Sequence, residues 1–218
     1  MRHDHVVDDE PERKPAAPPL DLREAIGGPM GMAETSLPAV AFVVAYTASG
    51  SDTNTAAKVA VGLALVLTLA RLVRRETPIH ALSGLVGVGF AAFIATRSGR
   101  AEDFFLPGLL ANVAYASALL ISLAVRRPLI GIIVTKLDGE GNEWRRDPDR
   151  VQAFVRATWL WAGLFATRLI VQLPLYAAGA VVALGVAKTA MGLPLYGIGL
   201  WLTWLLVRRH RIPAPAQA

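Results

Sequence analysis

The chain contains no cysteine and little charge, and each deficit excludes a class of protein. Without Cys among its 218 residues it can form no disulfide, no thiolate nucleophile and no Cys-ligated zinc or iron–sulfur centre. Charged residues make up 18% of the chain and hydrophobic residues 54%, whereas an ordinary soluble domain carries about 25% charge. The apolar residues occur in long runs that a soluble core does not require. The sequence therefore predicts an integral membrane protein.

Six apolar segments have lengths close to or above the roughly 20 residues that a helix needs to cross a bilayer. Inside lipid every backbone amide must be paired within its own segment, so these segments are predicted to be α-helices. The predicted fold is an all-α bundle of six transmembrane helices, arranged as three hairpins. The expected spans are residues 33–49, 55–73, 79–96, 104–125, 151–176 and 185–207.

The two ends of the chain differ in composition from this body. Residues 1–19 are rich in charge and proline and poor in apolar side chains, which predicts a disordered acidic tail because there is too little apolar surface to offset the entropy of ordering. The transmembrane domain is expected over residues 20–209, and residues 210–218 form a short C-terminal tail.

The distribution of basic residues predicts the orientation in the membrane. Three even-numbered spans end in the same tripeptide, Val-Arg-Arg, at residues 73–75, 125–127 and 207–209, and most of the 22 Lys and Arg residues fall in the segments on that side. Because such residues concentrate in cytoplasmic loops, both termini are expected in the cytoplasm of a bacterium, with the bundle in its plasma (inner) membrane. The loop after the fourth span is expected to present a basic patch to anionic lipids, formed by Arg126, Arg127, Arg145, Arg146 and Arg150.

Arg168 is the most informative polar residue, because it lies well inside the fifth span. An Arg at the centre of a spanning helix costs about 2.5–3.5 kcal/mol, so such residues usually face the bundle interior and find a partner. Gln172 lies one turn further on the same face, and we expect Asp103 to pair with Arg168. Other candidates for this intramembrane polar site are Asn112, Tyr115 and Lys188. Two interpretations stay open: a buried ion pair that fixes helix register, which is favoured, and a site that binds an anion or gates a path.

The sequence Leu-Pro-Leu-Tyr occurs twice, at residues 173–176 and 193–196. Pro174 can end the fifth span. Pro194 follows Gly192 inside the sixth span and is expected to kink it, because proline lacks the amide hydrogen of the helical ladder. Broken helices build binding sites in some transporters, and they also occur in passive bundles.

No catalytic signature is present. The sequence has no Ser-His-Asp order, H-E-x-x-H, G-x-S-x-G or phosphate-binding loop. We therefore do not expect an enzyme, and we expect no metal, no cofactor and no nucleic-acid partner.

Several ordered motifs resemble those of one family. They are Gly27-Gly28-Pro29, Asp103-Phe104-Phe105-Leu106-Pro107-Gly108, Arg127-Pro128-Leu129-Ile130-Gly131, Ala157-Thr158-Trp159-Leu160-Trp161 with Arg168 and Gln172, and Met191-Gly192-Leu193-Pro194-Leu195. Over about residues 24–209 they resemble DUF3159, a family of uncharacterised actinobacterial multi-pass membrane proteins. The family has no established activity, so the resemblance implies a membrane location and supplies no catalytic residue. A looser likeness to intracellular septation protein A lies in the Phe-Phe before one span and the Arg-Pro after it, and it implies a role in the envelope or in cell division.

Two functions are consistent with the sequence. The favoured hypothesis is a non-enzymatic envelope or accessory protein that acts through helix contacts with a membrane-protein partner or a second copy of itself. The alternative is a small-solute or ion permease whose polar site surrounds Arg168.

Overall fold

The computed structural model describes residues 28–75, 78–137 and 141–208, and these residues contain helices and no strand. The fold is therefore all-α. The long helices are α2 (Gly28–Ala48), α3 (Thr53–Val73), α4 (Pro78–Ser98), α5 (Leu106–Ala124) and α7 (Pro148–Ala177). The shorter ones are η1 (Ala101–Phe105), α6 (Leu129–Leu137), η2 (Glu143–Arg146), α8 (Val181–Ala190) and α9 (Leu193–Arg208).

All six predicted spans fall on helices. Four stretches are long and apolar enough to cross a membrane: α3, η1 with α5, α7, and α8 with α9. Shorter apolar stretches lie in α2, at Ser36–Ala48, and in α4, at Leu82–Ser98. That the chain crosses a membrane six times stays a prediction, and the predicted tails 1–19 and 210–218 lie outside the described residues.

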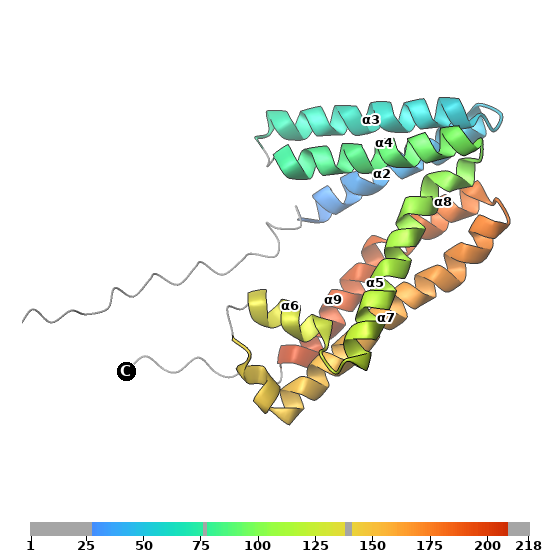
Figure 1. The fold of residues 1–218 in the computed structure, drawn as a ribbon. Coiled ribbons are helices and arrows are strands. Elements are labelled where there is room, and N and C mark those ends of the chain that lie inside the picture. The colour runs from blue at the N-terminus through green and yellow to red at the C-terminus, as the bar shows by residue number, and fades with distance from the viewer. Residues whose placement is uncertain (1–27, 76–77, 138–140, 209–218) are drawn as a thin grey trace, which may run out of the picture.

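The helices form two layers (Figure 1). In the first layer α3 packs against both α2 and α4, and in the second α7 packs against both α5 and α9. The layers meet at the end that carries the turns 49–52, 99–105 and 178–180, where α2 contacts α8, and they diverge toward the opposite end.

An aromatic cluster joins the two layers at their closed end. Phe42 of α2 is fully buried and stacks on Phe104 of η1 with ring centroids 4.0 Å apart, and Phe105 meets Phe42 edge-on at 6.2 Å. Small alanines of α3 and α4 surround these rings and allow close approach of the helices. The cluster connects the layers through a few large side chains, so its packing should determine their relative placement.

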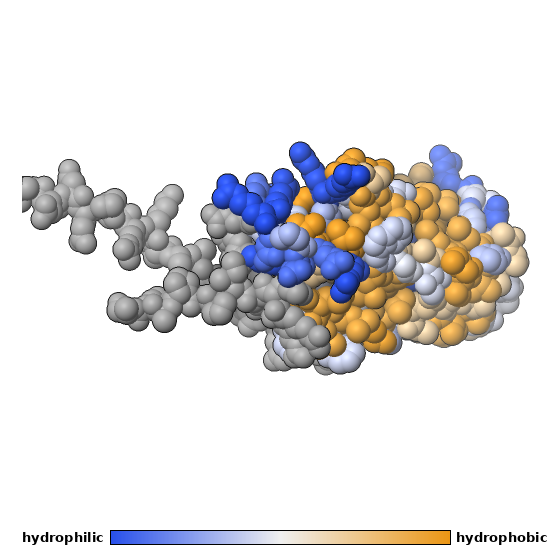
Figure 2. Space-filling model, turned by 90° about the horizontal axis from the view of Figure 1, so that it is seen from below, coloured by the Kyte–Doolittle hydropathy of each residue, from blue (hydrophilic) through white to orange (hydrophobic). Residues whose placement is uncertain are grey.

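Much of the remaining surface is apolar. Figure 2 shows hydrophobic side chains over the middle of one face, with hydrophilic groups gathered toward the two ends. Large exposed side chains, Val66, Val86 and Ile170 among them, lie on three different helices. A soluble monomer rarely exposes so extensive an apolar surface, whereas lipid would cover it.

Helix α6 corrects the expectation of a polar cytoplasmic loop over residues 126–150. Its sequence, LIGIIVTKL, is apolar, and the helix packs against α7. Gly131 permits this contact, because a Cβ atom at that position would lie 2.9 Å from the ring of Phe154, which is 1% exposed. The segment between the fourth and fifth spans is therefore partly built into the bundle.

The close approach of α6 to α7 predicts a matched pair of glycine substitutions. Gly131→Ala should destabilise the protein by about 1–3 kcal/mol, because the new methyl group would overlap the ring and the Cβ atom of the buried Phe154. Gly163→Ala on α7 has nothing within 4 Å of the new methyl group and should be neutral or stabilising by up to about 1 kcal/mol. Thermal unfolding of both variants in detergent measures the difference; equal melting temperatures would contradict the packing described for α6.

Asp52 caps the N-terminus of α3. Its carboxylate accepts hydrogen bonds from the backbone amides of Asn54 (3.0 Å) and Thr55 (3.2 Å), and the hydroxyl of Thr55 also donates to it. The Thr55 hydroxyl and then the Asn54 amide hold the pKa of Asp52 below its ordinary value. The cap is therefore fully formed above the ordinary Asp pKa of about 4 and is lost as the pH falls through the lower value of the folded protein.

This cap predicts a pH effect confined to one helix end. Between pH 6 and pH 3, amide hydrogen exchange in the first turn of α3 should accelerate in the wild type beyond the intrinsic change with pH. In Asp52→Asn, which has no carboxylate to protonate, the protection of the same amides should not depend on pH. Equal pH dependence in both proteins would show that the carboxylate does not support this turn.

Five helix ends finish with a residue in the left-handed backbone region. At the closed end of the molecule these residues are glycine or follow one: Gly50 (φ 70°), Ser51 (φ 73°), Gly99 (φ 72°) and Gly179 (φ 63°). The ends of α3 and α5 instead place Arg75 (φ 59°) and Arg126 (φ 53°) in this conformation, which is strained for a residue with a Cβ atom.

The predicted basic patch is only partly exposed. Arg126, Arg127, Arg145 and Arg146 are at the surface, whereas Arg150 is 5% exposed and its guanidinium lies 6.0 Å from the ring centroid of Phe154. The expectation that Arg150 faces lipid is wrong: it lies on the α7 face that packs inward beside Phe154.

Candidate functional site

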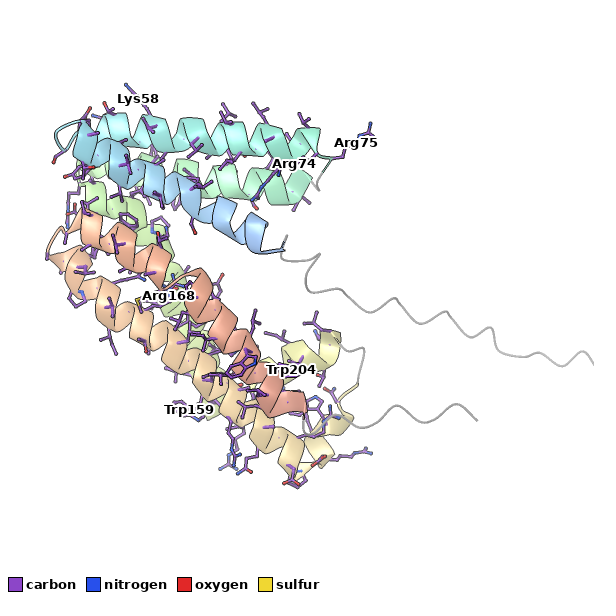
Figure 3. The ribbon with its side chains drawn as sticks, turned by 180° about the vertical axis from the view of Figure 1, so that it is seen from behind. Lys58, Arg74, Arg75, Trp159, Arg168 and Trp204 are labelled. Atoms are coloured by element: carbon purple, nitrogen blue, oxygen red, sulfur yellow. The ribbon has the colours of Figure 1, made fainter. Side chains whose placement is uncertain are left out.

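Arg168 and Gln172 lie one turn apart on the inward face of α7. Their side chains are 6% and 4% exposed. Nε and Nη1 of Arg168 and Nε2 of Gln172 are buried without a hydrogen-bond partner among the residues that the structure describes. A buried donor without an acceptor costs about 1–3 kcal/mol, and more when it is charged. Figure 3 places Arg168 inside the layer of α7, α8 and α9, whereas Lys58 projects outward from α3.

The guanidinium of Arg168 faces the helix break between α8 and α9. Its central carbon lies 5.0 Å from the ring centroid of Tyr196 on α9. The chain leaves helical geometry at Met191 and Gly192, two residues before Pro194. A Cβ atom at Gly192 would lie 3.1 Å from the carbonyl oxygens of Lys188 and Thr189, so this tight turn favours glycine. The break brings Tyr196 to the level of Arg168.

Lys188 is a second cation at this site. Its ammonium lies 5.3 Å from the ring centroid of Phe105 and would lie 3.8 Å from a Cβ atom at Gly108 of α5. Among the described residues, the charged group close enough to act on it is Arg168, which is also a cation. A buried cation, Arg168, and a half-buried one, Lys188, are therefore neighbours.

The nearest acidic residues have other partners. Asp103 is buried and accepts a hydrogen bond from the hydroxyl of Tyr176, and Glu102 forms an ion pair with Arg100 at 2.8 Å. The hydrogen bond and the charge of Glu102 raise the pKa of Arg100. The predicted Arg168–Asp103 contact is wrong, because Asp103 lies level with Tyr176. That residue is eight positions beyond Arg168, which is about 12 Å along a helix.

The other predicted site residues have different surroundings. Asn112 is buried on α5, one turn after Gly108 and hence on the face that meets Lys188. Tyr115 is 56% exposed, and its ring centroid lies 5.4 Å from that of Phe165. The structure thus brings together Arg168, Gln172 and Lys188, with Asn112 on the adjoining helix, and leaves Tyr115 at the margin.

Tyr176, Tyr196 and Phe105 belong to these polar contacts and were absent from the predicted site. A signal for the tyrosines was present in the sequence. Each ends one copy of the Leu-Pro-Leu-Tyr repeat; one copy places its tyrosine on Asp103 and the other places its tyrosine under Arg168. Phe105 carries no such signal, because an aromatic residue at a span end is also typical of a membrane interface.

The residues of this site are suited to binding an anion. The site offers an amide donor and two cations, and no carboxylate contacts either cation within residues 28–75, 78–137 and 141–208. The same residues contain no group of three His, Asp or Glu side chains that could hold a metal ion. Guanidinium donors match the oxygens of carboxylate and phosphate groups.

The comparisons with known proteins identify the family and no activity. Residues 26–214 match the family model described as protein of unknown function (DUF3159). No match was found among the curated proteins or the solved structures. The chain belongs to the DUF3159 family.

Proposed function

We propose that this protein binds an anion inside the membrane and carries it across, as a small permease. The observation that carries the proposal is the buried guanidinium of Arg168, which has unpartnered donors and a second, half-buried cation, Lys188, nearby, while no carboxylate of the described residues contacts either of them. An ion pair that only fixes helix register requires an acid, and the candidate acid, Asp103, is engaged by Tyr176. An anion between the two cations would satisfy the unpartnered donors and relieve the repulsion.

The arrangement of the helices supports this proposal. Consecutive long helices are antiparallel, and the first layer consists of α2, α3 and α4, so the second layer begins at the end opposite to the first (Figure 1). Two halves of opposite direction and a broken helix beside the binding residues are characteristic of secondary transporters. Here the break between α8 and α9 lies next to Arg168.

The experiment is anion uptake into phosphatidylcholine liposomes that contain the purified protein. Chloride, phosphate, acetate and octanoate are offered separately, with empty liposomes as the control. The proposal expects at least one of these anions to enter faster with the protein than without it. Uptake equal to that of empty liposomes for all four anions would overturn it.

A second function is favoured by one observation. Gly84 and Gly87 form a small-residue surface on α4, and, apart from the adjoining backbone of α4, no atom of the described residues lies within 4 Å of a Cβ atom built at either position. Such surfaces let another helix approach closely, which suits an accessory protein that acts through helix contacts. That role predicts no anion uptake, so the liposome experiment separates the two functions.

The absence of cysteine allows a direct test of the proposed orientation, in which both termini are cytoplasmic. With both termini inside, Ser98→Cys, at the exposed last residue of α4, should react with a membrane-impermeant maleimide in intact cells. Arg145→Cys, which is exposed in η2, should react only after the membrane is permeabilised. The reverse pattern would invert the topology, and reaction of both residues in intact cells would contradict the predicted number of crossings.

A further inference from the structure

An apolar pocket lies directly beside the proposed anion site. It has a volume of about 440 Å³ and is enclosed by α5, α6, α7 and α9, which is within the usual range for ligand pockets. Its wall includes Ala118 and Tyr115 of α5, Trp161 and Phe165 of α7, and Thr203 of α9. It is lined almost entirely by apolar and aromatic side chains, so its occupant must be largely apolar.

Two polar side chains of this wall, Trp161 and Thr203, already have partners. The indole of Trp161 donates to the hydroxyl of Thr203 at 2.9 Å, and that hydroxyl donates to the carbonyl of Gly199 at 2.7 Å. The pocket therefore has little to offer a polar ligand at this position, and an alkyl chain can occupy it without leaving these groups unpaired.

One aromatic ring separates the pocket from Arg168. The ring of Tyr196 stacks on Trp161 with centroids 6.1 Å apart and meets Phe165 at 6.2 Å, and both of these residues line the pocket. Arg168 lies over the same Tyr196 ring. A ligand with a charged end and an apolar body would therefore meet a cation and an apolar cavity in adjacent positions.

We propose that the anion of this site is the head group of an amphiphile: one carboxylate or phosphate group on a single long alkyl chain. This inference rests on the proposed function and specifies its substrate class. The head group lies at Arg168 and Lys188, and the chain lies in the pocket between α5, α6, α7 and α9. Tyr115 and Trp204, about half exposed at the pocket margin, leave a lateral opening through which the chain can enter from the bilayer.

The test is photo-crosslinking with a long-chain fatty acid that carries a diazirine near the middle of its chain. The purified protein is labelled in phosphatidylcholine nanodiscs, and labelled peptides are mapped by mass spectrometry. We expect labelling concentrated on α6 and α9 and about tenfold weaker labelling there by the methyl ester of the probe, which lacks the charge. Palmitate and hexadecyl phosphate should compete, and their relative potency distinguishes the two head groups. Hexadecanol should not compete.

Substitutions test separately where the alkyl chain and the head group of the ligand bind. Ala118→Trp fills the pocket from an exposed position and should abolish labelling, whereas Ala114→Trp, one turn earlier on α5 and outside the pocket wall, should leave it unchanged. Arg168→Gln should reduce labelling to the level of the methyl ester. Labelling that is spread over lipid-facing helices such as α4, or that is unaffected by Arg168→Gln, means that the pocket holds only bulk lipid and overturns the inference.

The failure of this inference can be distinguished from the failure of the proposed function. Octanoate or phosphate uptake that depends on Arg168, together with diffuse labelling, refutes the amphiphile and leaves the anion permease intact. Specific, charge-dependent labelling without uptake of any anion supports the ligand and refutes transport. The absence of both results refutes both proposals.

Discussion

Arg168→Gln is expected to reduce anion uptake by about a hundredfold. A charged hydrogen bond contributes about 1.5–3 kcal/mol, so two such bonds from the guanidinium contribute about 3 kcal/mol or more, and each 1.4 kcal/mol corresponds to a factor of ten. Glutamine keeps a polar side chain at the site while removing the charge. The measurement is the initial rate of uptake into liposomes, normalised to the amount of reconstituted protein.

The control for this prediction is Lys58→Gln. Lys58 is an exposed cation that projects outward from α3 (Figure 3), so its loss should leave uptake unchanged. Arg168→Met provides a second check, because replacing a buried charge that no carboxylate contacts by an apolar side chain should maintain or raise thermal stability. An Arg168 variant that is stably folded and transports at the wild-type rate would refute the role of this residue.

Phe42→Ala is expected to destabilise the protein by about 3 kcal/mol. The ring is fully buried between the two layers and stacks on Phe104 at 4.0 Å, so its removal leaves a cavity that the surrounding helices fill only in part. Because lipid is as apolar as the ring, the loss comes from packing contacts more than from exclusion of water. Equilibrium unfolding in detergent measures this free energy, and distances between spin labels on α3 and α7 would reveal loosening of the closed end.

Phe90→Ala is the matched substitution on the outer surface. Phe90 lies on α4 and is 57% exposed, so its loss should change the free energy of unfolding by less than about 0.5 kcal/mol. If the two substitutions have equal effects, the aromatic cluster around Phe42 does not hold the layers together.

The helices could be predicted because lipid leaves the backbone few alternatives. An apolar run of 20 residues in a membrane must pair its amides internally, so the spans follow from length and composition. Helix α6 could not be predicted in this way. Its nine residues are too short to cross a bilayer, and its helical state depends on the contact between Gly131 and Phe154, which are 23 positions apart in the sequence.

The residues of the site could be predicted more reliably than their partners. Arg168, Gln172 and Lys188 stand out because polar side chains are expensive in apolar segments. Pairing Arg168 with Asp103 failed because the position of a residue along its helix does not determine which side chains meet it from neighbouring helices. Tyr196 reaches Arg168 through the break at Gly192, and the geometry of that break depends on how α8 and α9 pack against the other helices.

The two arginines in the left-handed conformation have a consequence for biogenesis. Arg75 and Arg126 occupy helix-terminal positions where glycine would be more stable by about 1 kcal/mol. On the predicted orientation, these same side chains help the insertion machinery retain their turns in the cytosol. Substituting glycine at either position would relieve the backbone strain of the folded turn. It would also remove a positive charge that orients the nascent chain during insertion. At these two positions the requirement to insert the right way round therefore limits how stable the finished protein can become.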